Sequence, residues 1–490
     1  MAVTVTDRPA RKGPAAPRWG MASRALPPLV IGTAIAVTPV PEGLSANAWH
    51  YFALFAAVIT GIITEPMPPA ILGLAGVTLA AVLRLVRASP ADATSWALSG
   101  FANSTVWLIF AAYMFALGYS QTGLGRRIAL QLIRVMGHRT LGLGYAVAFA
   151  DLVLAPFTPS TTARSGGTIY PVIRNIPELY GSRPDDESAR KIGAYLLYTA
   201  VATSCVTSSM FLTGLAPNAL AMSIIVRTLN VSISWMDWFK GFAPVGIILF
   251  ILVPVLLYKI YPPEIKEAPE APQWAAEQLR QIGSITRQEI MMLLLVIGAL
   301  GLWIGGGAYI DPAMVAILVV VLMVVLRVVS WNQIIGNAQA WNVLVWFATL
   351  VTLAAGLAET KFVDWIARSI APSLAGLPIY GTIVTLVGTF FLLHYFFASL
   401  TAHTAALFPV FLGVAITIPG VSPVGWALLL GYSIGLMGIL TSYASGQVAI
   451  YYGSGFIKRR DFWVLGFIMS VVFFVVYVVI IVPWLAYLQI

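Results

Sequence analysis

Runs of about 20 apolar residues recur from one end of the chain to the other, each long enough to cross roughly 30 Å of hydrocarbon as a helix. No other feature limits the possible folds as strongly. Hydrophobic residues make up 59% of the chain and charged residues only 10%, a balance too apolar for a soluble domain. The sequence therefore predicts an all-α integral membrane protein.

The apolar runs predict about 11 transmembrane helices. They span residues 26–39, 48–64, 68–88, 97–120, 192–226, 240–260, 288–306, 312–329, 340–358, 423–453 and 462–488. Two further apolar segments, 141–176 and 377–418, are too long for one crossing and break in the middle. We expect two re-entrant hairpins there, because irregular backbone at membrane depth is tolerated only where protein or a water-filled cavity surrounds it.

Composition divides the chain into a tail, a group of N-terminal helices, two repeats and a linker. Residues 1–24 are polar, Pro-rich and basic, and we expect a disordered cytoplasmic tail. The other parts are the N-terminal helices (25–93), the first repeat (94–260) with hairpin 141–176 and broken helix 192–226, the cytoplasmic linker (261–287), and the second repeat (288–490) with hairpin 377–418 and broken helix 423–453. No nucleotide-binding loop occurs in the chain, so ATP is not expected to drive it.

Lys and Arg residues set the expected orientation. Of the 28, only six fall on the predicted outer side: Arg84, Arg87, Arg227, Lys240, Lys361 and Arg368. Because positively charged loops stay in the cytoplasm, we expect a multi-pass protein of the cell inner membrane with its N-terminus inside and its C-terminus outside. The net charge of +9 then reflects topology rather than nucleic-acid binding, and the lone Cys205 excludes an internal disulfide.

The two repeats correspond segment by segment. Val106-Trp107-Leu108 matches Val345-Trp346-Phe347, and Tyr170-Pro171-Val172 at the end of the first hairpin matches Phe408-Pro409-Val410 in the second. The amphipathic segments 124–136 and 361–371 also correspond, and each is expected to lie along the membrane surface. Matched elements on opposite faces of the membrane form an inverted repeat, whose interface near the midplane is where secondary transporters bind substrate.

The break of each hairpin has nearly the same sequence. Pro159-Ser160-Thr161-Thr162-Ala163-Arg164 in the first answers Ala398-Ser399-Leu400-Thr401-Ala402-His403 in the second. Hydroxyls and free N–H groups at the start of a helix bind anions, and two facing tips fit a dianion with one carboxylate each. Small residues that allow close helix packing are the structural alternative. The candidate substrate-binding residues are Ser160, Thr161, Thr162, Ser399 and Thr401.

Segments 192–226 and 423–453 are also interrupted. The interruptions are Thr213-Gly214-Leu215-Ala216-Pro217-Asn218 and Thr441-Ser442-Tyr443-Ala444-Ser445-Gly446. Discontinuous helices expose carbonyl and N–H groups to ions or substrate at mid-membrane. A Pro or Gly kink relieved by a neighbouring helix is the alternative. The candidate residues here are Thr213, Pro217, Asn218, Thr441 and Ser442.

Arg164 and His403 follow the two tips at equivalent positions. An intramembrane Arg is costly and indicates function by default, so Arg164 either contacts the substrate or holds an anion site together without a metal cation. A snorkelling Arg and a neutral core histidine are the structural alternatives. His403 can also couple transport to pH. Asp151, inside the first hairpin, either pairs with Arg164 or carries a proton.

These motifs resemble the divalent anion/sodium symporter family, which transports di- and tricarboxylates. The similarity covers nearly the whole chain after the tail and is greatest to the branch of citrate/succinate and 2-oxoglutarate/malate antiporters. The segments that carry it are 155–167, 394–399, 208–213 and 452–455. The resemblance implies a homodimer in which a fixed scaffold domain, including helices 25–93, supports a transport domain that slides as an elevator. It also implies that Ser160, Thr161, Thr162, Ser399 and Thr401 line the substrate site.

The chain departs from the Ser-Asn-Thr pattern of sodium-coupled members, because Thr161 and Leu400 occupy the middle positions. Leu400 has no side-chain oxygen, which weakens a sodium site there, and Arg164 and His403 can supply positive charge instead. Fixed charges cannot leave with the substrate, so they favour obligatory exchange over symport.

The sequence thus predicts a secondary active transporter that exchanges di-/tricarboxylates such as 2-oxoglutarate, malate, succinate or citrate across the inner membrane, independently of sodium. A sodium-coupled dicarboxylate or sulfate symporter and an anion channel are the alternatives. An enzyme is not expected, because His50, His138 and His394 show no clustering with a nucleophile. The expected partners are the carboxylate, membrane lipid and a second copy of the chain, with no nucleic acid, cofactor or metal.

Overall fold

The computed structural model describes residues 21–306, 309–374 and 376–490, and these residues are helical almost throughout. The one β-bridge found among them joins Arg139 and Glu267. The first 20 residues of the predicted tail lie outside the described residues. The prediction of an all-α fold is confirmed.

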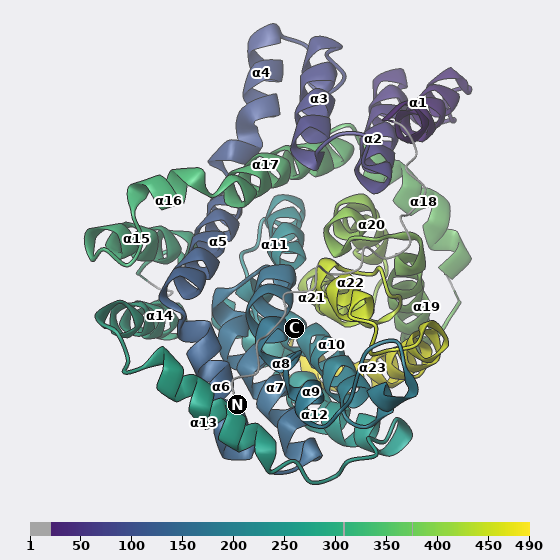
Figure 1. Ribbon diagram of the computed structural model, residues 1–490. Helices are drawn as coiled ribbons and strands as arrows, with labels where there is room; N and C mark the ends of the chain where they lie inside the picture. The colour runs from purple at the N-terminus through teal and green to yellow at the C-terminus, as the bar shows by residue number, and fades with distance from the viewer. Residues whose placement is uncertain (1–20, 307–308, 375) are drawn as a thin grey trace.

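The N-terminal helices form a group at one edge of the molecule, at the top of Figure 1. They are α1 (Met21–Val37), α2 (Ala46–Thr64), α3 (Pro69–Val82) and α4 (Pro90–Leu98). Ser45 and Ser89 cap α2 and α4 by accepting from backbone N–H groups of the first turn. The helix α1 begins before the expected tail boundary at residue 24, because no Gly or Pro stands between Met21 and Leu26 to stop it.

The first repeat contains one long helix, a surface helix, a hairpin and a broken helix. Its elements are a 3₁₀ turn (Ser99–Ala102), α5 (Ser104–Thr122), α6 (Leu124–Met136), α7 (Thr140–Leu154), a 3₁₀ turn (Ala155–Phe157), a π-helix (Thr162–Ile169), α8 (Tyr170–Ile173), α9 (Ile176–Leu179), a 3₁₀ turn (Glu187–Arg190), α10 (Gly193–Met210), a 3₁₀ turn (Leu212–Gly214), α11 (Ala216–Leu229) and α12 (Trp235–Ile260). The chain therefore turns at residues 158–161 and breaks again at 211–215.

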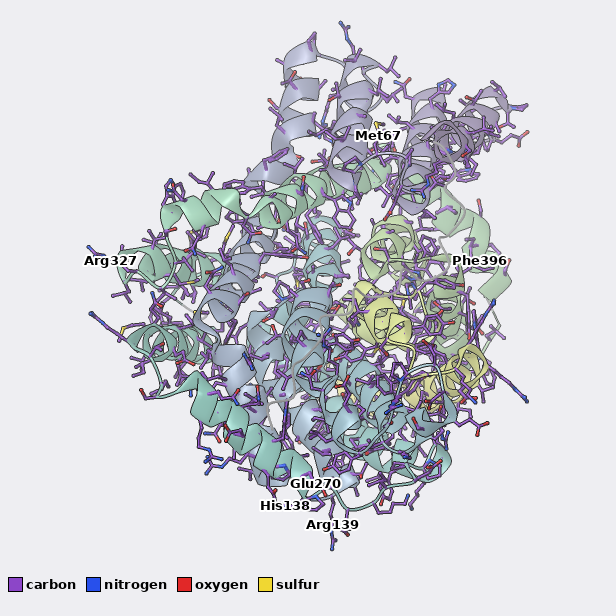
Figure 2. The ribbon with its side chains drawn as sticks, viewed as in Figure 1. Met67, His138, Arg139, Glu270, Arg327 and Phe396 are labelled. Carbon is purple, nitrogen blue, oxygen red and sulfur yellow. The ribbon has the colours of Figure 1, made fainter. Side chains whose placement is uncertain are left out.

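The linker contains α13 (Glu270–Ile282), which packs on α6. Figure 2 shows His138, Arg139 and Glu270 together at the edge where the linker meets the start of α7. Two backbone bonds fix this junction, because the N–H of Ala268 donates to the His138 carbonyl and that of Thr140 donates to the Lys266 carbonyl. The linker is thus bound to the first repeat.

The second repeat repeats this order of elements. They are α14 (Arg287–Gly305), α15 (Pro312–Val325), α16 (Trp331–Gly336), α17 (Ala338–Glu359), α18 (Phe362–Leu374), α19 (Ile379–Leu392), a 3₁₀ turn (Leu393–Phe396), α20 (Leu400–Ala415), α21 (Pro423–Leu436), a 3₁₀ turn (Met437–Ile439), α22 (Gly446–Gly453) and α23 (Arg459–Tyr487). The hairpin of this repeat turns at 397–399, and its broken helix is interrupted at 440–445, between α21 with its 3₁₀ turn and α22.

Among the described residues, eight helical segments are long and apolar enough to cross a membrane, and six more are apolar but shorter. The expected eleven crossings counted each broken helix as one. The structure divides them, so α11 and α21 fall in the shorter class. All 18 residues of α10 are buried, and so is most of α21, which places the two broken helices in the middle of the protein.

Candidate functional site

The first hairpin tip is bound to the break between α10 and α11. The N–H of Ala216, at the start of α11, donates to the Pro159 carbonyl over 2.9 Å. The hydroxyl of Thr213 donates to the Pro156 carbonyl and accepts from the indole N–H of Trp235 at 2.9 Å. Backbone groups that a regular helix would satisfy are therefore satisfied here by the neighbouring irregular segment.

Arg164 lies at the centre of this contact and is 1% exposed. One of its terminal nitrogens, Nη1, donates to the carbonyl of Thr158 at 2.7 Å and to that of Gly214 at 2.8 Å. The first carbonyl belongs to the hairpin tip and the second to the helix break. The guanidinium thus occupies the position between irregular carbonyls where a free cation would otherwise be needed.

The remaining nitrogens of Arg164 also have partners in the protein. Nε donates to Asp151 Oδ1 at 3.2 Å, and Nη2 donates to Ser208 Oγ at 3.0 Å and to Thr207 Oγ1 at 3.5 Å. Thr207 in turn donates to the second carboxylate oxygen of Asp151. A guanidinium has five N–H donors, and five protein acceptors surround this one. Arg164 therefore keeps no donor free for a direct substrate contact, and Asp151 is its ion-pair partner.

The first hairpin tip also contacts the second repeat. Thr161 Oγ1 donates to the side-chain carbonyl of Gln447 at 2.6 Å, and both side chains are buried. Gly446 allows this approach, because a Cβ there would lie 2.3 Å from Thr162 Oγ1. The sequence predictions did not single out Gln447. Its signal in the sequence is an amide that directly follows a hydroxyl-rich break in an apolar run.

The second hairpin tip is bound to its own broken helix through main-chain acceptors. His394 Nε2 lies 3.0 Å from the Ala444 carbonyl, and the hydroxyl of Tyr443 donates to the Tyr395 carbonyl at 3.1 Å. Ser399 caps α20, because its Oγ accepts from the N–H of Ala402 at 3.3 Å. The second tip, at which α20 begins, thus lies beside the second break.

His403 is wholly buried at the start of α20 and is enclosed by rings. Its centroid lies 4.5 Å from that of Phe390, 5.1 Å from that of Phe397 and 5.1 Å from that of His394, each in an edge-on arrangement. Neither of its ring nitrogens has a hydrogen-bond partner among the described residues. Unlike Arg164, this side chain keeps its hydrogen-bonding capacity unused.

The other predicted residues fall into three groups. Ser160 and Asn218 make protein contacts: Ser160 Oγ accepts from the N–H of Ala163 at 3.2 Å, and Asn218 Nδ2 donates to the carbonyls of Ser208 and Phe211, although Asn218 Oδ1 has no partner among the described residues.

The Oγ1 of Thr441 is buried without a partner among the described residues, as is the neighbouring Ser445 Oγ, which sequence reasoning missed. The remaining candidates are Thr162, which is half-buried beside Gly446, Pro217 in the first turn of α11, Thr401, which is buried, and Ser442, which is half-buried.

The structure therefore brings both tips and both breaks into one connected cluster. Its free groups are hydroxyls, imidazole nitrogens and N–H groups at helix starts, which suit a carboxylate. The described residues hold no group of three or more His, Cys, Asp or Glu side chains that could bind a metal ion.

Comparison with known proteins decides the family. Residues 21–490 match the family described as "Sodium:sulfate symporter transmembrane region". The chain belongs to this family. The family is one of secondary transporters and not of enzymes, and the chain is a multi-pass membrane protein.

Among relatives in this family are the L-tartrate/succinate antiporters of Shigella sonnei and Escherichia coli K12. Each is 47% identical to the chain over 468 residues, which cover 93% of the chain and 96% of the relative. An identity of this level along nearly the full length includes both hairpins and both broken helices.

Two solved structures share the fold at low sequence identity. The YdaH transporter of Alcanivorax borkumensis has a TM-score of 0.56 at 16% identity and covers 86% of the chain and 97% of its own. MtrF of Neisseria gonorrhoeae has a TM-score of 0.54 at 13% identity, with coverages of 94% and 93%. These similarities support the helical membrane fold alone.

Proposed function

We propose that this sodium:sulfate symporter family member exchanges dicarboxylates across the membrane. Two observations support the proposal: the 47% identity to L-tartrate/succinate antiporters, and a cluster of both tips and both breaks that leaves hydroxyl groups of the second repeat without protein partners among the described residues. The sequence alone leaves several di- and tricarboxylates open. The names of the relatives favour four-carbon dicarboxylates such as succinate and tartrate.

The observation that carries exchange without sodium is the position of Arg164. Its guanidinium binds the carbonyls of Thr158 and Gly214, one from the tip and one from the break. A guanidinium held in this way joins the two irregular segments and cannot dissociate with the substrate. The carbonyls of a broken helix, which bind Na⁺ in sodium-coupled transporters, are thus already occupied, and we expect no sodium ion to accompany the substrate.

The substrate carboxylates are expected to bind the groups that the protein leaves free. These are the N–H groups that begin α20 and α22, together with the hydroxyls of Thr401, Thr441 and Ser445. Thr161 and Ser399 are expected to hold the two tips in position rather than to bind the substrate by themselves, because the hydroxyl of each already has a protein partner.

Counterflow in proteoliposomes tests the proposal. Vesicles loaded with succinate should take up external labelled succinate without sodium, and empty vesicles should take up little. A sodium gradient should not restore uptake into empty vesicles. Uptake of that kind would instead identify a sodium symporter, and steady single-channel currents would identify an anion channel.

The proposal extends to orientation and assembly. The six cations of the predicted outer side include Arg87, Arg227, Lys361 and Arg368, and these four line adjoining hollows on one face. Their grouping supports an N-terminus inside and a C-terminus outside, which cysteine labelling from each side of the membrane can test. The homodimer and the elevator movement remain predictions, and cross-linking in membranes tests the first.

A further inference from the structure

Each repeat has a hollow between one long helix (α5 or α17), the amphipathic helix that follows it (α6 or α18) and the hairpin. In the first repeat, the hollow is lined by the end of α5, by α6 and by α8, and it holds about 450 Å³. In the second, the hollow is lined by α17, α18, α20 and the neighbouring α11, and it holds about 630 Å³. Pro171 and Pro409, which correspond in the repeat, line one hollow each. The two hollows are therefore counterparts.

The first hollow is covered by the chain itself. Trp274 and Gln278 of the amphipathic helix α13 form part of its wall, and Gln278 accepts from Arg126 at 2.9 Å. Beside it, Arg127 donates to the carbonyl of Gly283 at 3.0 Å and to the carboxylate of Glu289 at 2.6 Å. An apolar face and polar anchors thus hold the linker helix over the hollow.

The second hollow has no such cover among the described residues. It lies far from the linker, and α13 and α18 are at opposite edges of the molecule in Figure 1. Its lining residues come from the four helices around it, from Lys361 before α18 and from Ile416 and Thr417 directly after α20. No residue of either tip motif lines it, so it is separate from the candidate substrate site. Its apolar wall includes Val351, Ala354, Ala355, Val363, Ala367, Pro409, Gly413 and Ile416.

The rim of the second hollow carries unpaired positive charge. Its charged residues are Arg227, Lys361 and Arg368 against Glu359 and Asp364. Both carboxylates have partners, since Glu359 pairs with Arg87 at the next hollow and Asp364 pairs with Lys361 at 3.4 Å. Arg227 and Arg368 have no ion pair among the described residues. An apolar wall below two free guanidinium groups matches an anionic amphiphile.

We propose that the second hollow binds an acidic phospholipid. Its phosphate contacts Arg227 and Arg368, and an acyl chain lies along the apolar wall. Guanidinium groups recognise phosphate in a bidentate manner, and basic pockets between transmembrane helices bind anionic head groups. The lipid fills on this face the place that α13 fills on the other. The lipid contacts α11, which follows the first break, α20, which follows the second tip, and α17, which follows neither. It therefore bridges two helices of the candidate substrate site and one helix outside it.

Thiol protection tests the site directly and does not depend on transport. Ala358 lines the hollow and is half-buried, and the one native thiol, Cys205, is buried. The variant Ala358→Cys, purified in dodecyl maltoside, should react with a fluorescent maleimide. Dodecyl phosphate should slow the reaction at least five-fold, whereas inorganic phosphate and succinate should not. Nanodiscs of phosphatidylcholine with phosphatidylglycerol should slow it relative to phosphatidylcholine alone.

The cation arm of the test uses Arg227→Gln with Arg368→Gln in the Ala358→Cys background. Protection should disappear there and persist in Arg183→Gln, which removes an exposed cation from a loop outside the hollow. Equal protection in all three variants, or protection by inorganic phosphate, would overturn the proposal. If the double variant unfolds, Arg368→Gln alone, on the surface helix α18, should reduce protection at least two-fold. Thermal unfolding shows whether a variant has lost protection because it has unfolded. Counterflow in the same samples reports separately on the exchange function.

Discussion

The two repeats share a tip design, but they leave their polar groups in different states. Around the first tip, Arg164, Asp151 and Thr213 are bonded to other protein groups. Around the second, His403 and Thr441 are buried without partners among the described residues. Buried polar groups without partners are uncommon in native proteins and call for an explanation. At the first break, Asn218 Oδ1 also lacks a partner among those residues, but it is an acceptor and not a donor. From this difference in donors we propose that the first half of the site is mainly a framework and that the second half receives the ligand.

Four substitutions that should lower stability, together with matched variants, can break or sharpen this comparison; the four are taken in order of their expected cost in unfolding free energy. Arg164→Ala should cost the most, about 3–5 kcal/mol, because it leaves Asp151 charged, buried and unpaired. Thermal unfolding should fall clearly, and succinate counterflow should be lost. Wild-type stability and exchange would contradict the framework role of Arg164.

A double variant separates charge from framework. Asp151→Ala with Arg164→Ala removes both members of the pair, so no unpaired charge remains and stability should partly recover. Counterflow should stay absent, because the carbonyls of Thr158 and Gly214 still lack their donor. Recovery of exchange in the double variant would show that only the unpaired carboxylate mattered.

Thr213→Val should come next, with a cost of about 1–3 kcal/mol, because the substitution leaves the indole N–H of Trp235 without its acceptor. Thr441→Val, at the corresponding break, removes a hydroxyl that has no protein partner and should leave stability unchanged or slightly raised. Its counterflow should nevertheless weaken through a higher KM for succinate. Equal stability losses in the two variants would remove the asymmetry between the repeats.

Thr161→Val should cost about 1 kcal/mol, the usual net value of one hydrogen bond, because the bond to Gln447 is lost. This bond joins the first tip to the second repeat, so the KM for succinate should rise. The matched control is Thr404→Val, whose hydroxyl donates within its own helix to the Leu400 carbonyl at 2.8 Å. A similar KM change in the control would argue against a special role for the contact between the repeats.

His403→Leu should have the smallest effect on stability, less than about 1 kcal/mol, because no hydrogen bond is lost and the surroundings are aromatic. Counterflow should fall at least ten-fold if an imidazole nitrogen hydrogen-bonds to the substrate. Phe390→Leu is the control for packing around the ring. Unchanged exchange in His403→Leu would assign the histidine to the core.

Much of the fold follows from local sequence signals. Apolar length and composition predicted helices close to their observed limits, as in 48–64 against Ala46–Thr64 and 240–260 against Trp235–Ile260. The turns at 158–161 and 397–399 lie at the hydroxyl-rich motifs, because Pro159 and the N-cap Ser399 each act on their own neighbours along the chain. The start of α5 was less exact, because the crossing expected from residue 97 includes the turn Ser99–Ala102 and α5 itself begins at Ser104.

Tertiary structure determines which polar side chains at the tips and breaks have hydrogen-bond partners. The sequence places Arg164 in a hairpin and Gln447 after a break, but it does not say which hydrogen-bond partners reach them. Some of those partners lie far along the chain, with Gly214 50 residues from Arg164 and Thr161 286 residues from Gln447. The same holds for His403, whose position matches that of Arg164 but whose neighbours are rings. Local sequence determines where the helices break, whereas only packing determines which polar groups at a break are satisfied and which stay free for a ligand.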